Sequence, residues 1–393
     1  MRKLSLAVIG MYIGILSAFS QTDSSAYKNK KLKTSEINFV TSYYHQDGDH
    51  SPVTGGIGTQ KLSDFATTIE LKLNKYDKKN RRHDVGFELG VDHYTSASSD
   101  KIDPHTISSE SHADLRIYPT ISYGITNEQK GNAISFNGSY SNEYDYNSIG
   151  GGIGFTKTSK DKNTDFNVKL QAYLDNLKLI LPIELRTGGG HDDGAWTGRN
   201  SYSGSFNFAQ VVNTRLQLAL MLDLIYQSGY LSTPFHRIYF TNGTEGIEKL
   251  PDSRFKIPVG MRLNYFLGDK FIIRSYYRFY HDNWGLTAHT FNIELPVKIT
   301  PNFSVSPFYR FYNQNGVKYY APYLKHAATE QFYTTDDDLS KFNSSTEGVG
   351  LRFIKPEGVF GLKRLNTLDL RFAHYNRNDG LNANIITLAL KFK

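Results

Sequence analysis

The chain has 393 residues, no cysteine and a formal net charge of +7. Without cysteine it forms neither disulfides nor thiolate metal sites, and a small positive charge without a basic cluster on a predicted helix does not indicate nucleic-acid binding. The mean hydropathy of −0.46 would suit a soluble protein. The 27 Tyr and 25 Phe, however, fit the aromatic girdles of a membrane β-barrel, whose polar lumen lowers the mean.

The N-terminus has the pattern of a secretory signal peptide, which we predict over residues 1–20. Two basic residues precede an apolar run over residues 4–16, and small residues lead to a cleavage point near Ser20/Gln21. The run is shorter than the roughly 20 apolar residues that a spanning helix needs. Residues 21–36 are predicted to be a short polar lead-in.

Residues 37–393 are predicted to form a single domain built from strands. Apolar and polar residues alternate in sixteen segments, as in strands with one apolar face. In the segment 214–226, for example, leucine occupies alternate positions. The segments are 37–44, 63–74, 83–94, 113–124, 132–141, 149–157, 164–175, 202–210, 214–226, 255–266, 271–280, 287–298, 303–313, 347–354, 367–375 and 383–392.

The connections between these segments predict how the strands close. All the very long connections occupy odd positions in the series, and the even ones are short. Outer-membrane barrels show this parity because their periplasmic turns are short and their external loops are long. We therefore predict an antiparallel transmembrane β-barrel of about 16 strands in the outer membrane. The count becomes 14 or 18 if the apolar segment 177–186, placed in a loop, or the long turn 355–366 is misassigned.

Four prolines fall inside predicted strands. They are Pro119, Pro258, Pro296 and Pro307. Because proline has no N–H to donate to a strand ladder, we expect each to lie at a bulge or a strand end.

Charged residues at inward positions of the alternation are the first candidate site. They are Arg116, Arg215, Arg262, Arg274, Arg278, Arg310, Arg352, Arg371, Glu88, Glu294 and Asp369. In one interpretation this arginine-rich lumen favours anions, because charged rings set pore selectivity. In the other, bases and acids pair across strands and fill the barrel.

The predicted external loops hold the second set of candidates. His191, Asp192 and Asp193 lie together near Trp196, and the other tryptophan is Trp284. Carboxylates can bind Ca²⁺, but the spacing matches no EF-hand, so we interpret this segment as a solvated loop and predict no metal or cofactor. The two tryptophans can stack on a ligand such as a sugar or anchor loop packing, and we favour packing.

Enzyme motifs are absent from the sequence. There is no G-x-S-x-G, H-E-x-x-H or phosphate-binding loop. The glycine-rich run 150–154 lies on a predicted strand with no helix after it, so its expected role is to let neighbouring side chains pack in a crowded lumen. We predict no enzymatic activity; a barrel enzyme with a Ser–His or Asp–His pair at the outer rim is a weaker alternative.

Several stretches together are similar to a known family. They are residues 142–155, 229–232, 250–267, 276–295 and 308–313. They resemble an uncharacterised family of Gram-negative outer-membrane barrels, catalogued as a domain of unknown function (number three-five-seven-zero). The resemblance covers most of the mature chain and implies the same fold and location, but no site residues. Its members look like neighbours of periplasmic flavin-transferase and thioredoxin-like proteins, which implies an envelope redox pathway.

Two functions follow from these observations. The first is a channel or transporter for small polar or anionic solutes. The alternative is a non-conducting scaffold in an envelope assembly, linked to a periplasmic redox or flavin system, with Lys363 and Arg364 as a docking point. The expected partners are outer-membrane lipid, the barrel-insertion machinery through the C-terminal strand, and an unidentified periplasmic protein. Lys393 follows Phe392, whereas many outer-membrane barrels end on the aromatic residue.

Overall fold

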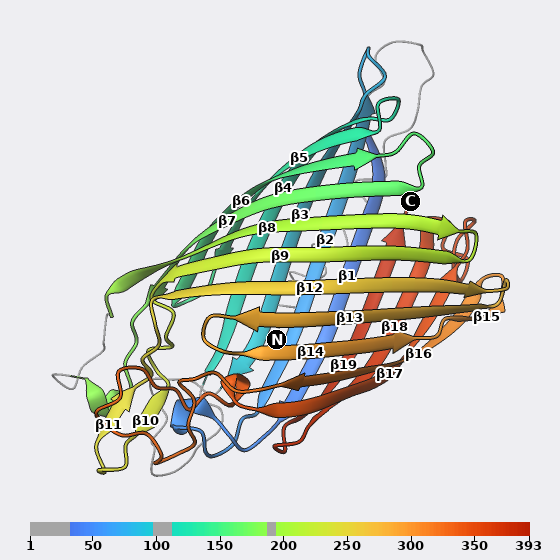
Figure 1. The fold of residues 1–393 in the computed structure, drawn as a ribbon. Coiled ribbons are helices and arrows are strands. Elements are labelled where there is room, and N and C mark those ends of the chain that lie inside the picture. The colour runs from blue at the N-terminus through green and yellow to red at the C-terminus, as the bar shows by residue number, and fades with distance from the viewer. Residues whose placement is uncertain (1–31, 97–111, 187–193) are drawn as a thin grey trace.

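The computed structural model describes residues 32–96, 112–186 and 194–393, which form a closed antiparallel β-barrel (Figure 1). The first strand pairs with the second and also with the last, so the sheet has no free edge. The sheet contains seventeen strands, but β14 and β15 both lie between β13 and β16 and share one position. The predicted sixteen-strand barrel is therefore confirmed.

The barrel strands alternate in direction around the wall. They are β1 (Lys33–Asp47), β2 (Leu62–Tyr76), β3 (Arg82–Ser96), β4 (His112–Asn127), β5 (Asn132–Asn142), β6 (Tyr146–Thr158), β7 (Thr164–Lys178), β8 (Trp196–Asn213), β9 (Leu216–Gly229), β12 (Ser253–Leu267), β13 (Phe271–Asp282), β14 (Thr287–Glu294), β15 (Val297–Thr300), β16 (Phe303–Gln314), β17 (Phe342–Ile354), β18 (Leu365–Arg377) and β19 (Asn382–Phe392). A hairpin of β10 (Arg237–Tyr239) and β11 (Glu245–Ile247) lies outside the wall, as do three 3-10 turns, η1 (Pro52–Thr54), η2 (Ile183–Leu185) and η3 (Asp337–Leu339). Within the described residues, no helix is long and apolar enough to cross a membrane.

The strand boundaries extend the predicted ones. β1 begins at Lys33, inside the predicted lead-in, and the predicted signal peptide lies outside the described residues. The ambiguous segment 177–186 is divided: its first two residues end β7 and η2 lies in the loop that follows. The segment adds no strand, and the turn 355–364 adds none either, which keeps the count at sixteen.

The four prolines interrupt the ladder in two ways. Pro296 separates β14 from β15, as expected for a strand end. Pro307 lies inside β16, contrary to expectation, but across from this break, where its carbonyl accepts a hydrogen bond from Leu295 N. Pro119 and Pro258 lie inside strands, contrary to expectation. Their strands keep the same register, but pairing with one neighbour skips two residues at each proline. A closed barrel tolerates the missing donor because the ladder resumes on both sides.

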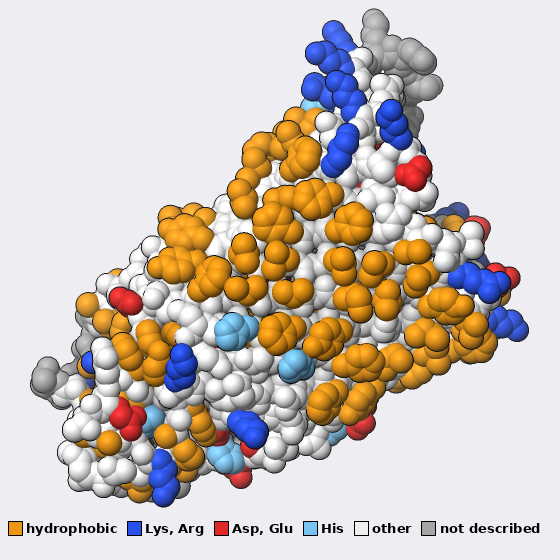
Figure 2. Space-filling view, in the orientation of Figure 1, with side chains coloured by type: hydrophobic (Ala, Val, Ile, Leu, Met, Phe, Trp, Pro, Cys, Tyr) orange, Lys and Arg blue, Asp and Glu red, His pale blue; other side chains and the backbone are white. Residues whose placement is uncertain are grey.

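The outer face of the wall is apolar. Side chains that point outward near the middle of the strands are large and solvent-exposed, such as Ile121 at 53%, Ile149 at 60% and Leu170 at 54%. Figure 2 shows these side chains covering the wall, with most Lys, Arg, Asp and Glu toward its ends. Such a belt is stable only against lipid, so the chain is a membrane barrel of the outer-membrane type.

The two ends of the barrel differ as the loop parity predicted. Both described termini lie at one end, which is the periplasmic end, and every connection at that end is short. The long loops 48–61, 230–252 and 315–341 and the described residues 179–186 of another lie at the other, external end and gather beside β10 and β11 (Figure 1). A small apolar core of Leu250, Trp284, Leu286, Ala288 and Val317 joins the loops 230–252 and 315–341 to the connection 283–286 and the start of β14. We call these packed loops the cap.

Candidate functional site

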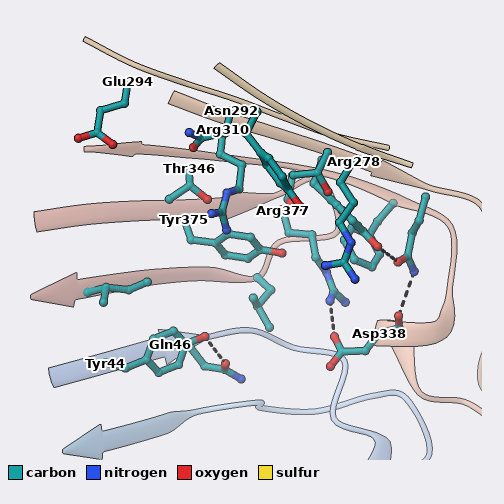
Figure 3. A pocket seen from close by; sticks show the side chains of 18 of the residues that line it. Tyr44, Gln46, Arg278, Asn292, Glu294, Arg310, Asp338, Thr346, Tyr375 and Arg377 are labelled. Atoms are coloured by element: carbon teal, nitrogen blue, oxygen red, sulfur yellow. Dashed lines mark hydrogen bonds and ion pairs between the residues drawn. The ribbon is translucent and has the colours of Figure 1, made fainter. Parts of the chain in front are cut away.

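The lumen contains a cavity of about 1220 Å³ below the cap, lined by strands β12 to β14 and β16 to β19 and by β1. Its charged lining is mostly cationic. The arginines are Arg262, Arg274, Arg278, Arg310 and Arg377, and the acids are Glu294 and Asp338. Figure 3 shows Arg278, Arg310 and Arg377 reaching into one shared space, from β13, β16 and β18 respectively.

The strand register stacks these arginines at successive depths. Inward positions of neighbouring strands pair at the same level. One level runs across five strands through Arg262, Tyr276, Asn292, Arg310 and Thr346. Arg278 lies one level nearer the cap, and Arg274 one level nearer the periplasmic end. Guanidinium groups therefore occupy three successive inward rows of this part of the wall.

Three of these arginines have no carboxylate partner. Among the described residues, Arg262, Arg278 and Arg310 form no ion pair, and Arg262 instead stacks over the Tyr276 ring at 5.7 Å. By contrast, Glu294 is shared, with Arg274 Nη1 at 3.5 Å and Arg371 Nη2 at 3.6 Å. Since guanidinium stays protonated in proteins, the cavity carries uncompensated positive charge.

Other acids point into the lumen from the opposite wall. β3 is third and β13 eleventh in the order of sixteen positions, so the two strands face each other across the lumen. Glu88 on β3 points inward directly opposite Glu70 on β2, and Asp92 accepts a hydrogen bond from the Tyr118 hydroxyl at 2.9 Å. The lumen therefore has a cationic and an acidic side.

The remaining predicted lumen charges are placed differently. Arg352 pairs with Asp369 at 2.6 Å, and Arg116 with Glu143 at 3.3 Å. Arg215 lies in the periplasmic turn 214–215, because β9 begins one residue later, so it belongs to no wall strand. The two interpretations of the lumen charges thus apply to different residues: some pair across strands and others stand without a partner.

The cap reaches the cavity through one acid that the sequence analysis did not place in the lumen. Asp338, in η3, accepts a hydrogen bond from Arg377 Nη1, and its carbonyl accepts one from Gln314 Nε2 at 2.9 Å (Figure 3). Arg377 continues the inward series on β18, but the predicted strand stopped at residue 375. Asp338 has no periodic signal, since it comes from a loop.

The two tryptophans have different surroundings. Trp284 is 3% exposed and packs in the cap, where its indole N–H donates to Ser253 O at 2.9 Å and Arg254 covers its ring at 4.3 Å. Trp196, at the start of β8, is 50% exposed. The packing role favoured for the tryptophans thus fits the surroundings of Trp284. His191, Asp192 and Asp193 lie outside the described residues.

A second polar cluster lies inside the cap. His236, Glu248 and Asp336 come within 4.8 Å of one another through their potential ligand atoms. Burial raises the pKa of Asp336 to about 7, and neighbouring acids add to this effect. Burial by itself lowers the pKa of His236, but the Glu248 carboxylate outweighs it and raises the pKa above its ordinary value.

A family match covers most of this architecture. The sequence profile of a family described as "Protein of unknown function (DUF3570)" matches residues 94–386. The chain belongs to the DUF3570 family. This confirms the resemblance read from the sequence, and the matched range includes every strand that lines the cavity except β1 and the end of β19. No curated protein matches the DUF3570 chain in sequence.

Solved structures similar to the DUF3570 chain include three from Gram-negative bacteria. OccK9 (OpdG) of Pseudomonas aeruginosa has 8% identity and a TM-score of 0.43, with 91% of this chain and 98% of that one covered. OccAB3 of Acinetobacter baumannii has 11% identity and a TM-score of 0.42 at the same coverage. A BenF-like porin from Pseudomonas fluorescens Pf-5 has 8% identity and a TM-score of 0.40, again at 91% and 98%.

Proposed function

We propose that this barrel is an outer-membrane channel for small polar solutes, with a preference for anions. One observation carries the proposal: Arg262, Arg278 and Arg310 line the lumen cavity, and no carboxylate of the described residues pairs with them. An anion in that cavity would gain charge-assisted hydrogen bonds that the protein does not already satisfy. The acidic facing wall would orient solutes that also carry a positive group.

In this proposal, the cap limits the size of the solutes that can pass. Loops that pack around Trp284 and place Asp338 beside Arg377 narrow the external mouth. Small solutes would pass beside the cap, and larger ones would need it to move. We therefore expect small conductance steps instead of a wide pore.

Planar-bilayer recording under a salt gradient tests the proposal. The mature protein should show a steady open level with an anion-selective reversal potential. Replacing Arg262, Arg278 and Arg310 by Gln should weaken that selectivity. Each removed charge that lay within about 7 Å of the path of the ion should lower it about threefold, for a contact screened by water. The matched control is Arg215→Gln in the periplasmic turn, which should leave the selectivity unchanged.

Two results would contradict the proposal. If the triple variant kept the selectivity of the wild type, these arginines would not set it. If heat-modifiable gel migration showed an intact barrel but no current flowed in any salt, the lumen would be closed. The second result would favour a scaffold whose partner could be sought by crosslinking from the turn 355–364.

A further inference from the structure

Two external loops bring a histidine and two carboxylates together inside the cap. His236 and Glu248 flank the β10–β11 hairpin, where Glu248 N donates to His236 O at 2.9 Å. Asp336 comes from the other loop, which runs beside this hairpin because Lys249 and Tyr333 exchange two backbone hydrogen bonds (Figure 1). The three side chains therefore meet across the contact between the loops 230–252 and 315–341.

The His236 ring is buried, with the residue 9% exposed, and its Nδ1 has no hydrogen-bond partner in the part of the chain that the structure describes. This atom lies 3.6 Å from Glu248 Oε1, too far for a hydrogen bond. A buried polar atom left unpaired costs about 1–3 kcal/mol. In a native protein, such an atom calls for a specific explanation, such as an ion.

The negative charges of Glu248 and Asp336 lie close together. Glu248 is 3% exposed and accepts hydrogen bonds from Thr233 N at 2.6 Å and from the Thr334 hydroxyl, and Asp336 accepts from Asp338 N at 3.0 Å. Neither acid has a Lys or Arg ion-pair partner in the described part of the chain. Two acids this close and this sheltered repel each other unless a proton or a cation lies between them.

The ligand types and the spacing suit a transition metal. Zinc binds imidazole nitrogen and carboxylate oxygen at about 2.0–2.2 Å, so tetrahedral ligand atoms lie about 3.4 Å apart. The observed 3.6 Å between His236 Nδ1 and Glu248 Oε1 is close to this value. Calcium prefers oxygen ligands throughout, and a nitrogen ligand therefore favours the zinc class.

We propose that His236, Glu248 and Asp336 bind one divalent transition-metal ion of the zinc class, which cross-links the two loops of the cap. Asp336 is two residues from Asp338, the acid that meets Arg377 in the lumen cavity. A bound ion would therefore hold the segment 336–338 over the cavity. This site is separate from the arginines that line the lumen cavity, and the proposal does not depend on the channel function.

Metal binding by the full mature protein in detergent, first stripped with a chelator, tests the site. Isothermal titration with Zn²⁺ should give one ion per chain. His236→Ala and Asp336→Asn should each weaken binding by about tenfold or more, since loss of even an outer-shell partner costs 10–100-fold. Glu245→Gln, an exposed acid on the same hairpin, is the matched control and should bind like the wild type. Heat-modifiable migration shows that each variant is folded.

The absence of cysteine allows a second readout of the cross-link. Spin labels attached after Glu245→Cys and Lys325→Cys would report the distance between the loops. Zn²⁺ should narrow the distance distribution, and His236→Ala should abolish the narrowing. Absence of stoichiometric Zn²⁺ binding, or equal binding in the folded His236→Ala and Asp336→Asn variants, would overturn the site. An unchanged distribution with one ion bound would overturn the cross-link.

Discussion

At the scale of single residues, Trp284 shows how one side chain organises an external turn. Asp282 accepts hydrogen bonds from the backbone N–H groups of Trp284 and Leu286, both at 3.0 Å, and forms an ion pair with Arg254. The guanidinium of Arg254 then covers the indole ring at 4.3 Å. The turn is thus fixed by polar contacts on one side and apolar packing on the other.

We expect Trp284→Ala to loosen the cap without opening the barrel. Truncation of a buried aromatic side chain costs about 3–5 kcal/mol, which raises the open population of the cap by about a hundredfold or more. Proteolysis of the loop 315–341 should accelerate accordingly. Trp196→Ala, at a 50% exposed position, should not change the cleavage rate. Equal rates for both variants would show that Trp284 does not hold the cap.

At the scale of elements, β6 shows why a strand can need glycine on one face only. An added Cβ at Gly150 would lie 2.7 Å from the Tyr173 ring, and one at Gly152 would lie 2.8 Å from Leu170 O. Both positions point inward. At Gly151, which points outward, the nearest atom would be 3.8 Å away. The glycines therefore make room for inward side chains of neighbouring strands, as the sequence predicted for this run.

The two faces of β6 predict opposite responses to one added methyl group. Gly150→Ala should destabilise the barrel by about 1–3 kcal/mol, because the crowded lumen must shift Tyr173. Gly151→Ala should be close to neutral, since its methyl group meets only lipid. Urea midpoints of the refolded proteins, followed by tryptophan fluorescence, measure the difference. If both substitutions cost the same, crowding in the lumen is not the reason for glycine.

At the scale of the whole molecule, alternation divides every strand between lipid and lumen. On β9, Leu220 points outward and is 45% exposed, whereas Met221 points inward, where its Cε lies 3.4 Å from the Cβ position of Gly260. Neighbouring residues thus face different solvents. This division gives the chain a polar mean hydropathy despite its apolar outer surface.

Arginine should therefore be costly at one of these neighbours and tolerated at the other. Leu220→Arg places a charge against lipid and should cost about 2–4 kcal/mol near the bilayer midplane. Met221→Arg adds a charge to a hydrated lumen and should cost less. Reversible unfolding in lipid vesicles gives both values. A larger cost for Met221→Arg would mean that the sidedness of β9 is inverted.

The sequence predicted the wall better than the site. Fourteen of the sixteen segments lie wholly in a barrel strand; the segment 214–226 loses its first two residues to a turn, and 287–298 is divided between β14 and β15. The alternation also placed Arg262, Arg278 and Arg310 on the inner face. It did not show that these three lack partners while Arg352 pairs with Asp369. Pairing depends on which strands are neighbours and on the register between them.

By itself, the sequence determined the barrel and its two faces and predicted about sixteen strands, and the structure then excluded the alternatives of 14 and 18. The physical reason is that lipid and water act on every second residue, so the pattern is local and repeats along the chain. Only the tertiary structure decided the cap, the placing of Asp338 beside Arg377, and the meeting of His236 and Glu248 with Asp336. Loops carry no such period, and their contacts form between segments far apart in the chain.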